Sequence, residues 1–143
     1  ELHAAILNVK FKYLDKWLED RFQVACRYQK LFEKYNLSDK IRLPLNNANS
    51  IKNHKEHTFH QYVIFVEDRD GLQEYLKENE IGTNIYYPLC LHLQECFKYL
   101  GYKKGDFPIA EEASKHVLAI PMYPELTEEK QEYVVSKISK FYN

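Results

Sequence analysis

The sequence predicts an α+β fold in which a small three-stranded sheet is covered by helices and a long helix stands at the N-terminus. Apolar residues recur at helical spacing through the first 35 positions. Three short apolar runs, at 59–66, 83–87 and 117–120, have the length and residue types of strands. Amphipathic stretches separate these runs and follow the last one. The length of 143 residues is common for a single domain, so one domain over 1–143 is expected.

The first 35 residues predict one long helix, straight or kinked, with two helices broken near Asp20 as the alternative. Its apolar face consists of Leu2, Ile6, Val9, Tyr13, Trp17, Phe22, Ala25, Phe32 and Tyr35. A helix of this length spans about 50 Å at 1.5 Å per residue, more than a domain of this size can cover. Part of it is therefore expected to pack on material outside the chain. Because the helical pattern starts at Glu1 without a capping residue, we also expect the chain to be cut from a longer protein.

The middle of the chain predicts a loop followed by a β-α-β unit. Residues 44–57 are polar and rich in turn formers, which indicates a loop. The run 59–66 follows as a largely buried strand, and residues 70–79 predict an amphipathic helix capped by Asp70. Residues 83–87 complete the unit as a second strand.

The last third predicts three helices around one more strand. Pro88 ends the preceding strand, and a short helix is expected over 93–100. Pro108 is expected in the first turn of a helix that reaches about His116. The strand 117–120 then stops at Pro121, and Thr127 is expected to cap the final helix.

Composition excludes several classes of function. There are 20 Lys and Arg residues against 21 Asp and Glu, and their interspersion leaves no basic stripe for nucleic acid. Three cysteines without framework spacing indicate free thiols and a cytoplasmic location. No apolar run approaches the roughly 18 residues that cross a bilayer. No nucleic-acid or membrane partner is expected.

Two groups of potential metal ligands favour structural roles. The first is His54, His57 and His60. Spacing of three would cluster them only on a helix, and this segment is not helical in pattern, so local hydrogen bonding is favoured over a metal site. The second is Cys90, His92 and Cys96. Their spacing matches no known ligand set, and free cysteine usually packs as a small apolar residue, so neither a metal nor a nucleophile is expected.

Glycines and adjacent carboxylates carry no further chemistry in the sequence. No phosphate-binding glycine motif is present. The adjacent Glu111 and Glu112 point to different sides of the predicted helix, which indicates a solvated face rather than an acid/base pair.

The densest group of polar and aromatic residues lies at 81–94. Strand alternation places Asn84 and Tyr86 on one face and Tyr87 on the other, and Pro88 then redirects the chain so that His92 lies near the strand end. Polar tips gathered there form a candidate ligand site of Tyr86, Tyr87 and His92. On the pattern alone, packing of these rings with their tips in water is an equal alternative.

At these residues the sequence resembles the DegT/DnrJ/StrS family of PLP-dependent sugar-nucleotide aminotransferases. Residues 81–94 resemble the family segment I-x-T-x-x-H-Y-P-x-P-L-H-L-Q. Residues 1–7 resemble E-L-Q-A-A-x-L, and 60–64 resemble H-x-Y-V-I. Residues 100–108 resemble L-G-Y-x-x-G-D-F-P, and 121–127 resemble L-P-M-Y-P-x-L-T. The partial matches keep their order over essentially the whole chain.

The resemblance implies the C-terminal small domain of a fold type I transferase, preceded by a large domain that binds pyridoxal 5'-phosphate (PLP). Such enzymes are homodimers that transfer an amino group, commonly from L-glutamate, to a keto sugar carried on a nucleotide. The lysine that holds PLP belongs to the large domain, upstream of Glu1, so no residue of this chain is expected to be catalytic. The fragment alone is expected to be inactive.

Carried over by position, the family's H-Y pair falls on Tyr86 and Tyr87, and the histidine of P-L-H-L-Q falls on His92. These three residues would line the sugar-nucleotide side of the site. Tyr86 stands where the family has His, and Cys90 where it has Pro. His3 stands where the family has Gln. Because of these three departures, Tyr86 foremost, the sugar is expected to differ from that of common members. The alternatives are a non-catalytic small-ligand-binding module and a dimerisation module of the same ancestry.

Overall fold

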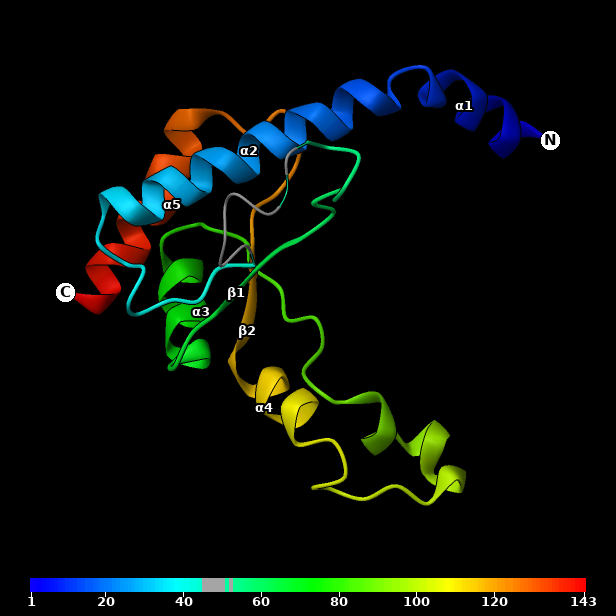
Figure 1. The fold of residues 1–143 in the computed structure, drawn as a ribbon, viewed down its shortest axis with the longest axis vertical. Coiled ribbons are helices and arrows are strands. Elements are labelled where there is room, and N and C mark those ends of the chain that lie inside the picture. Colours follow the sequence, from blue (N-terminus) through cyan, green and yellow to red (C-terminus); the bar gives the residue numbers. More distant parts are fainter. Residues whose placement is uncertain (45–50, 52) are drawn as a thin grey trace.

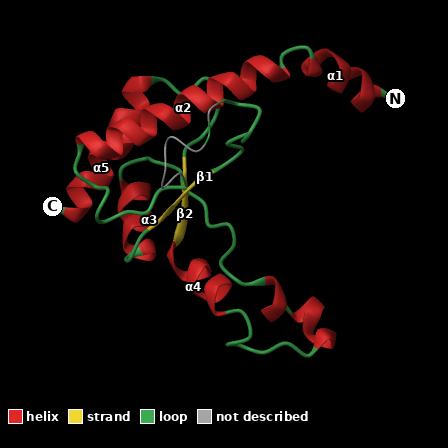
Figure 2. Ribbon diagram, in the orientation of Figure 1, coloured by secondary structure: helices red, strands yellow, loops and turns green. Residues whose placement is uncertain are grey.

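The computed structural model describes residues 1–44, 51 and 53–143. The predicted loop over 44–57 therefore lies partly outside the described residues. Figures 1 and 2 show a helical and β body from which two parts project, the N-terminal helix and a segment between the two strands. In chain order the elements are α1 (Leu2–Phe11), α2 (Leu14–Lys34), β1 (Tyr62–Phe65), α3 (Arg69–Glu78), η1 (Leu91–Leu93), η2 (Glu95–Leu100), α4 (Pro108–His116), β2 (Val117–Ile120) and α5 (Glu128–Tyr142).

The N-terminal segment forms two helices, so the prediction of one long helix was wrong. The chain turns at Lys12 and Tyr13, and α1 bends away from the line of α2 (Figure 1). The break lies well before Asp20, where the alternative placed it. Neither residue at the turn is a helix breaker, and α1 buries no residue, so no packing keeps the two helices in line.

The core lies where α2, α3 and α5 meet the sheet. Helices α2 and α5 contact each other, and α3 contacts α5 and β2. Tyr28 of α2 shows how the parts join: its ring lies 5.0 Å from that of Tyr62 in β1, and its hydroxyl donates to the carbonyl of Pro121 at 2.9 Å. The buried helix residues of the same core include Val24, Phe32, Leu72, Leu76, Val134, Val135 and Ile138. Burial of each such side chain contributes about 1.5–3 kcal/mol.

The sheet has two antiparallel strands rather than the three predicted. Tyr62 of β1 pairs with Ile120 of β2, and Phe65 pairs with Val117. The predicted strand 83–87 is reduced to one bridge, in which Asn84 exchanges two backbone hydrogen bonds with Ala119, of 3.1 and 2.7 Å. The chain turns away from β2 after this bridge, and Pro88 has no N–H to continue a ladder.

Strand β1 is shorter than predicted because its expected start is not extended. Phe59 has a positive φ of 44°, which lies outside the β region, and the centre of its buried ring lies 6.3 Å from that of Phe22. His60 therefore precedes the strand instead of lying in it. A second bridge pairs Arg42 with Phe65 on the outer side of β1.

Helix α3 is capped by Asp68, not by Asp70 as predicted. The Asp68 carboxylate accepts from the backbone N–H of Gly71 at 3.0 Å, three residues on, as an N-cap should. The carboxylate lies so close that a Cβ at position 71 would stand 2.4 Å from its Oδ2 atom, so a larger residue there would make the Asp68 side chain shift. Asp70 instead accepts from Arg69 at the surface.

The C-terminal elements follow their local signals. The predicted helix 93–100 is instead two 3₁₀ turns, η1 and η2, separated by Gln94 in extended conformation. Pro108 does start α4 and Thr127 does cap α5, accepting from the N–H of Lys130 at 3.4 Å. We call residues 86–116 the arm; none of them is buried, and it projects from the body (Figure 1). No described helix combines the length and apolar character needed to cross a membrane.

Candidate functional site

The three predicted site residues line one cavity, of about 400 Å³, in the arm. Its walls are the segment 86–92 and the facing side of α4. The lining residues are Tyr86, Tyr87, Leu89, Cys90, Leu91, His92, Phe107, Ala110, Ala113, Ser114 and Val117. The structure thus brings together residues that the sequence only grouped by position. Rings and aliphatic side chains form most of the surface, with few polar groups, as is typical of small-molecule sites.

Tyr86 and Tyr87 differ in how much of each ring is free. The Asn84 side-chain amide donates to the Tyr86 hydroxyl at 3.1 Å, which agrees with the predicted alternation that puts both on one face. The Tyr87 ring is 66% exposed and stands edge-on to that of Tyr86, with centroids 5.7 Å apart. Tyr87 therefore lines the cavity while most of the residue stays open to solvent.

His92 contacts α4 through the side chain of Glu111. Its Nε2 atom lies 3.0 Å from Oε1 of Glu111, and the two side chains are only 8% and 12% exposed. An ionised carboxylate only accepts hydrogen bonds, so Nε2 carries the proton in this pair. The imidazole also packs 4.8 Å from the ring of Phe107. His92 is thus oriented by two partners before any ligand binds.

Glu111 belongs to the candidate site through its hydrogen bonds, although the sequence analysis did not predict this. Its Oε1 atom accepts from the backbone N–H of Gly105 at 2.7 Å and from that of Phe107 at 3.4 Å, in addition to His92. These hydrogen bonds, that from Gly105 foremost, lower the pKa of the Glu111 carboxyl below its ordinary value. The prediction of a solvated face was wrong for Glu111, though it holds for the exposed Glu112, which pairs with Lys115. The available signal was the position of Glu111 in the first turn of α4, where backbone N–H groups need acceptors.

The histidines near residue 57 make separate local contacts. His54 Nδ1 lies 2.6 Å from a carboxylate oxygen of Glu19, and the N–H of Phe59 donates to His57 Nδ1 at 3.0 Å. His60 lines a different, smaller cavity with Tyr86. In the described ranges, no group of three histidine, cysteine or acidic side chains is placed to hold a metal ion.

The cysteines are free thiols, as the sequence predicted. Cys90 lies in the wall of the arm cavity, and Cys96 is exposed on η2 with Gln94 as its hydrogen-bond acceptor. Cys26 lies on α2, where burial raises the pKa of its thiol.

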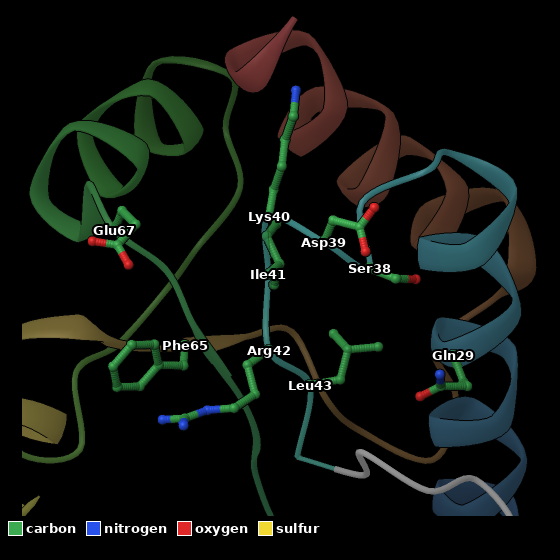
Figure 3. Close-up of a pocket in the computed structure, with 9 residues that line it drawn as sticks. All are labelled: Gln29, Ser38, Asp39, Lys40, Ile41, Arg42, Leu43, Phe65 and Glu67. Carbon is green, nitrogen blue, oxygen red and sulfur yellow. The ribbon is translucent and has the colours of Figure 1, made fainter.

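A second cavity, of about 370 Å³, lies on the body between α2 and β1 (Figure 3). Its charged residues have both signs, Lys40 and Arg42 against Asp39 and Glu67. Lys40 is already engaged, because its ammonium donates to the carbonyl of Tyr142 and to Asn143, each at 2.9 Å. The guanidinium of Arg42 lies 4.0 Å from the centre of the Phe65 ring. These contacts hold the C-terminus and the edge of the sheet. With side chains of both signs, the cavity favours neither an anionic nor a cationic ligand.

The two-stranded sheet, its flanking helices and the projecting arm together form a small mixed α/β unit. This fold is that of the small domain of fold type I aminotransferases. The structure is similar to the crystal structure of S. venezuelae DesV in complex with a ketimine intermediate, with a TM-score of 0.82 and 25% sequence identity. The match covers 96% of the present chain. It covers 35% of that chain.

Sequence comparison points to the same group. Residues 1–139 match the model of the DegT/DnrJ/EryC1/StrS aminotransferase family, so the chain belongs to this family. It is 49% identical over 142 residues to a "Pleiotropic regulatory protein" of Geobacillus stearothermophilus, covering 99% of this chain and 37% of the relative. It is 31% identical over 141 residues to the dTDP-3-amino-3,6-dideoxy-alpha-D-galactopyranose transaminase of Aneurinibacillus thermoaerophilus, covering 99% of this chain and 36% of the relative. The chain thus spans about a third of the length of the proteins it matches.

Proposed function

We propose that residues 1–143 are the small domain of a PLP-dependent aminotransferase that moves an amino group from L-glutamate to a nucleotide-linked keto sugar. In this proposal the large domain precedes Glu1, and the enzyme acts as a homodimer in the cytoplasm. The observation that carries the proposal is the arm cavity, in which the residues matched to the family's substrate segment share one surface. Family membership over nearly the whole chain and the transaminase among its relatives support it.

The arm cavity suits the substrate rather than the cofactor. Its described lining contains no lysine to form a Schiff base with PLP. The residues that line the arm cavity therefore do not fit as the holding site of the cofactor, and the proposal places PLP on the large domain. When bound there, PLP supplies the electron sink that amino transfer needs.

Three residues of the arm would bind the sugar nucleotide. The exposed ring of Tyr87 offers a face for a sugar or base, and its hydroxyl can donate to or accept from a sugar hydroxyl. The Tyr86 hydroxyl, already accepting from Asn84, remains able to donate. Glu111 occupies Nε2 of His92, which leaves Nδ1 to accept from a substrate hydroxyl.

The test is an absorbance spectrum of the full-length gene product loaded with PLP. We expect a visible band from the protein-bound cofactor that bleaches when L-glutamate is added. A nucleotide-linked keto sugar should then restore the band. The chain 1–143 alone, mixed with PLP, serves as the matched control and should show no such band.

A second candidate function rests on the name of the relative that shares 49% identity, a "Pleiotropic regulatory protein". In that case the same arm would hold a small ligand without chemistry. The spectrum separates the two functions, because a full-length protein that stays colourless with PLP contradicts the transferase proposal. Binding of a nucleotide sugar by such a colourless protein, measured by calorimetry, would support the ligand-binding module.

A further inference from the structure

We propose that Glu111 is a positioning residue of the substrate site, which fixes the imidazole of His92 and the 105–107 turn so that His92 presents Nδ1 as a hydrogen-bond acceptor. This inference rests on the proposed function and deepens it. Glu111 would not touch the substrate; it would act through His92 and through the wall formed by Phe107.

The geometry of Glu111 joins three points of the arm that lie apart in the sequence. One carboxylate oxygen meets His92 on η1 and the N–H groups of Gly105 and Phe107 just before α4. The Glu111 and His92 side chains are nearly enclosed, so water competes poorly for these hydrogen bonds. Glu111 is therefore the common anchor of the two sides of the cavity.

Glu111 also positions Phe107, whose ring forms part of the cavity wall. Glu111 fixes the backbone at Phe107, whose ring packs 4.8 Å from His92 and 5.2 Å from Tyr102. Behind this wall the arm has no apolar core, because none of its residues is buried as a whole. Loss of the carboxylate would therefore release the turn and the imidazole together.

The tautomer of His92 follows from the pair. The carboxylate accepts at Nε2, so neutral His92 carries its proton on Nε2 and has a lone pair on Nδ1. Within the part of the chain that the structure describes, Nδ1 is not hydrogen-bonded. A sugar hydroxyl is the chemical partner that such an acceptor fits.

The experiment compares Glu111→Gln and Glu111→Ala in the full-length, PLP-loaded protein, with Glu112→Gln as the matched control on the exposed neighbour. Two half-reactions are followed by the cofactor absorbance: one with L-glutamate, and the reverse one with dTDP-3-amino-3,6-dideoxy-α-D-galactopyranose as probe. The tautomer of His92 is read from the ¹⁵N shifts of the histidine-labelled protein, assigned by a His92→Gln variant.

We expect Glu111→Ala to lower kcat/KM in the amino-sugar half-reaction by about tenfold or more, mainly through KM, because an oriented acceptor is lost. The L-glutamate half-reaction should stay within about twofold of the wild type. Glu111→Gln, which keeps an acceptor oxygen for the turn, should lie between the two, and Glu112→Gln should match the wild type. The Nε2–H tautomer of His92 should become a mixture in Glu111→Ala.

Three results would overturn the inference: unchanged amino-sugar kinetics in Glu111→Ala, equal loss of both half-reactions, or a mixed His92 tautomer in the wild type. Failure of the wild-type protein to respond to L-glutamate contradicts the proposed function instead. In that case, or if the probe is not turned over, the ¹⁵N spectrum decides alone. A tautomer that depends on Glu111 supports the positioning role, and one that does not depend on it refutes that role.

Discussion

At the scale of single residues, the polar side chain most fully enclosed by the body is Gln131 on α5. Its Oε1 atom accepts from Nε of Arg27 at 2.7 Å, and its Nε2 atom donates to the carbonyl of Val24 at 2.9 Å. Arg27 in turn donates to the carbonyl of Leu126 at 3.0 Å. This chain of hydrogen bonds joins α2 to α5 inside an otherwise apolar contact, so every member depends on its partners.

We expect Gln131→Leu to destabilise the contact between α2 and α5 by about 1–3 kcal/mol, because the side chain of Arg27 and the carbonyl of Val24 lose their partner in a buried place. Amide hydrogen exchange of the α2 and α5 peptides in the full-length protein measures this free energy. The matched control is Gln23→Leu on the exposed face of α2, expected within about 0.5 kcal/mol of the wild type. Equal protection in the two variants would refute this account of Gln131.

At the scale of elements, the arm is held by hydrogen bonds and ring contacts rather than by a core. Its 3₁₀ turns bury no residue, and α4 contributes the Glu111 carboxylate as their anchor. Because the pKa of that carboxyl is lower in the folded arm than in the unfolded chain, ionisation of Glu111 favours the folded arm. This contribution is complete above the unfolded pKa, about 4.3, and is lost as the pH falls through the lowered folded value.

The pH dependence of the arm should therefore disappear when Glu111 cannot ionise. We expect the peptide 101–107 to exchange its amides more slowly in the wild type than in Glu111→Gln at pH 7. The two rates should converge as the pH falls below about 4.3, since a protonated carboxyl and an amide are both neutral. Exchange mass spectrometry, with each pair of rates compared at the same pH, measures the ratio. A constant ratio across this range, or the same change in Glu112→Gln, would contradict the assignment.

At the scale of the whole molecule, α1 is an apolar helix with nothing packed on it. All ten of its residues are exposed, among them Leu2, Leu7 and Phe11. A helix with apolar residues around most of its surface is normally buried. The relatives are almost three times as long as the chain, which supports the proposal that a large domain covers α1.

In the full-length protein we expect hydroxyl-radical labelling of Phe11 to be at least several-fold slower than that of Tyr133, after correction for intrinsic reactivity. Phe11 is 74% exposed and Tyr133 47% exposed in the structure, so the reverse order is expected if nothing covers α1. Apolar burial against the large domain is the physical reason. Labelling of Phe11 as fast as that of Tyr133 would contradict the proposed placement.

The sequence by itself determined the elements whose signals are local. Pro108 starts α4 because its ring fixes φ and its missing N–H is not needed there, and Thr127 caps α5 with its own hydroxyl. The strand 117–120 was predicted with its observed bounds, and Pro121 follows it. The grouping of Tyr86, Tyr87 and His92 was also predicted, from the residue pattern at 81–94 and from the family resemblance. Their role in binding stays a proposal.

Only the tertiary structure decided the features that need a distant partner. Whether residues 83–87 form a strand depends on how far they stay beside β2, and they meet it only at Asn84. Glu111 looked like any surface carboxylate until the fold enclosed it with His92 and Gly105. Neighbours in the chain set local backbone preference, but pairing and enclosure are set by residues far away in sequence. That is why the starts of α4 and α5 could be predicted and the anchoring of the arm by Glu111 could not.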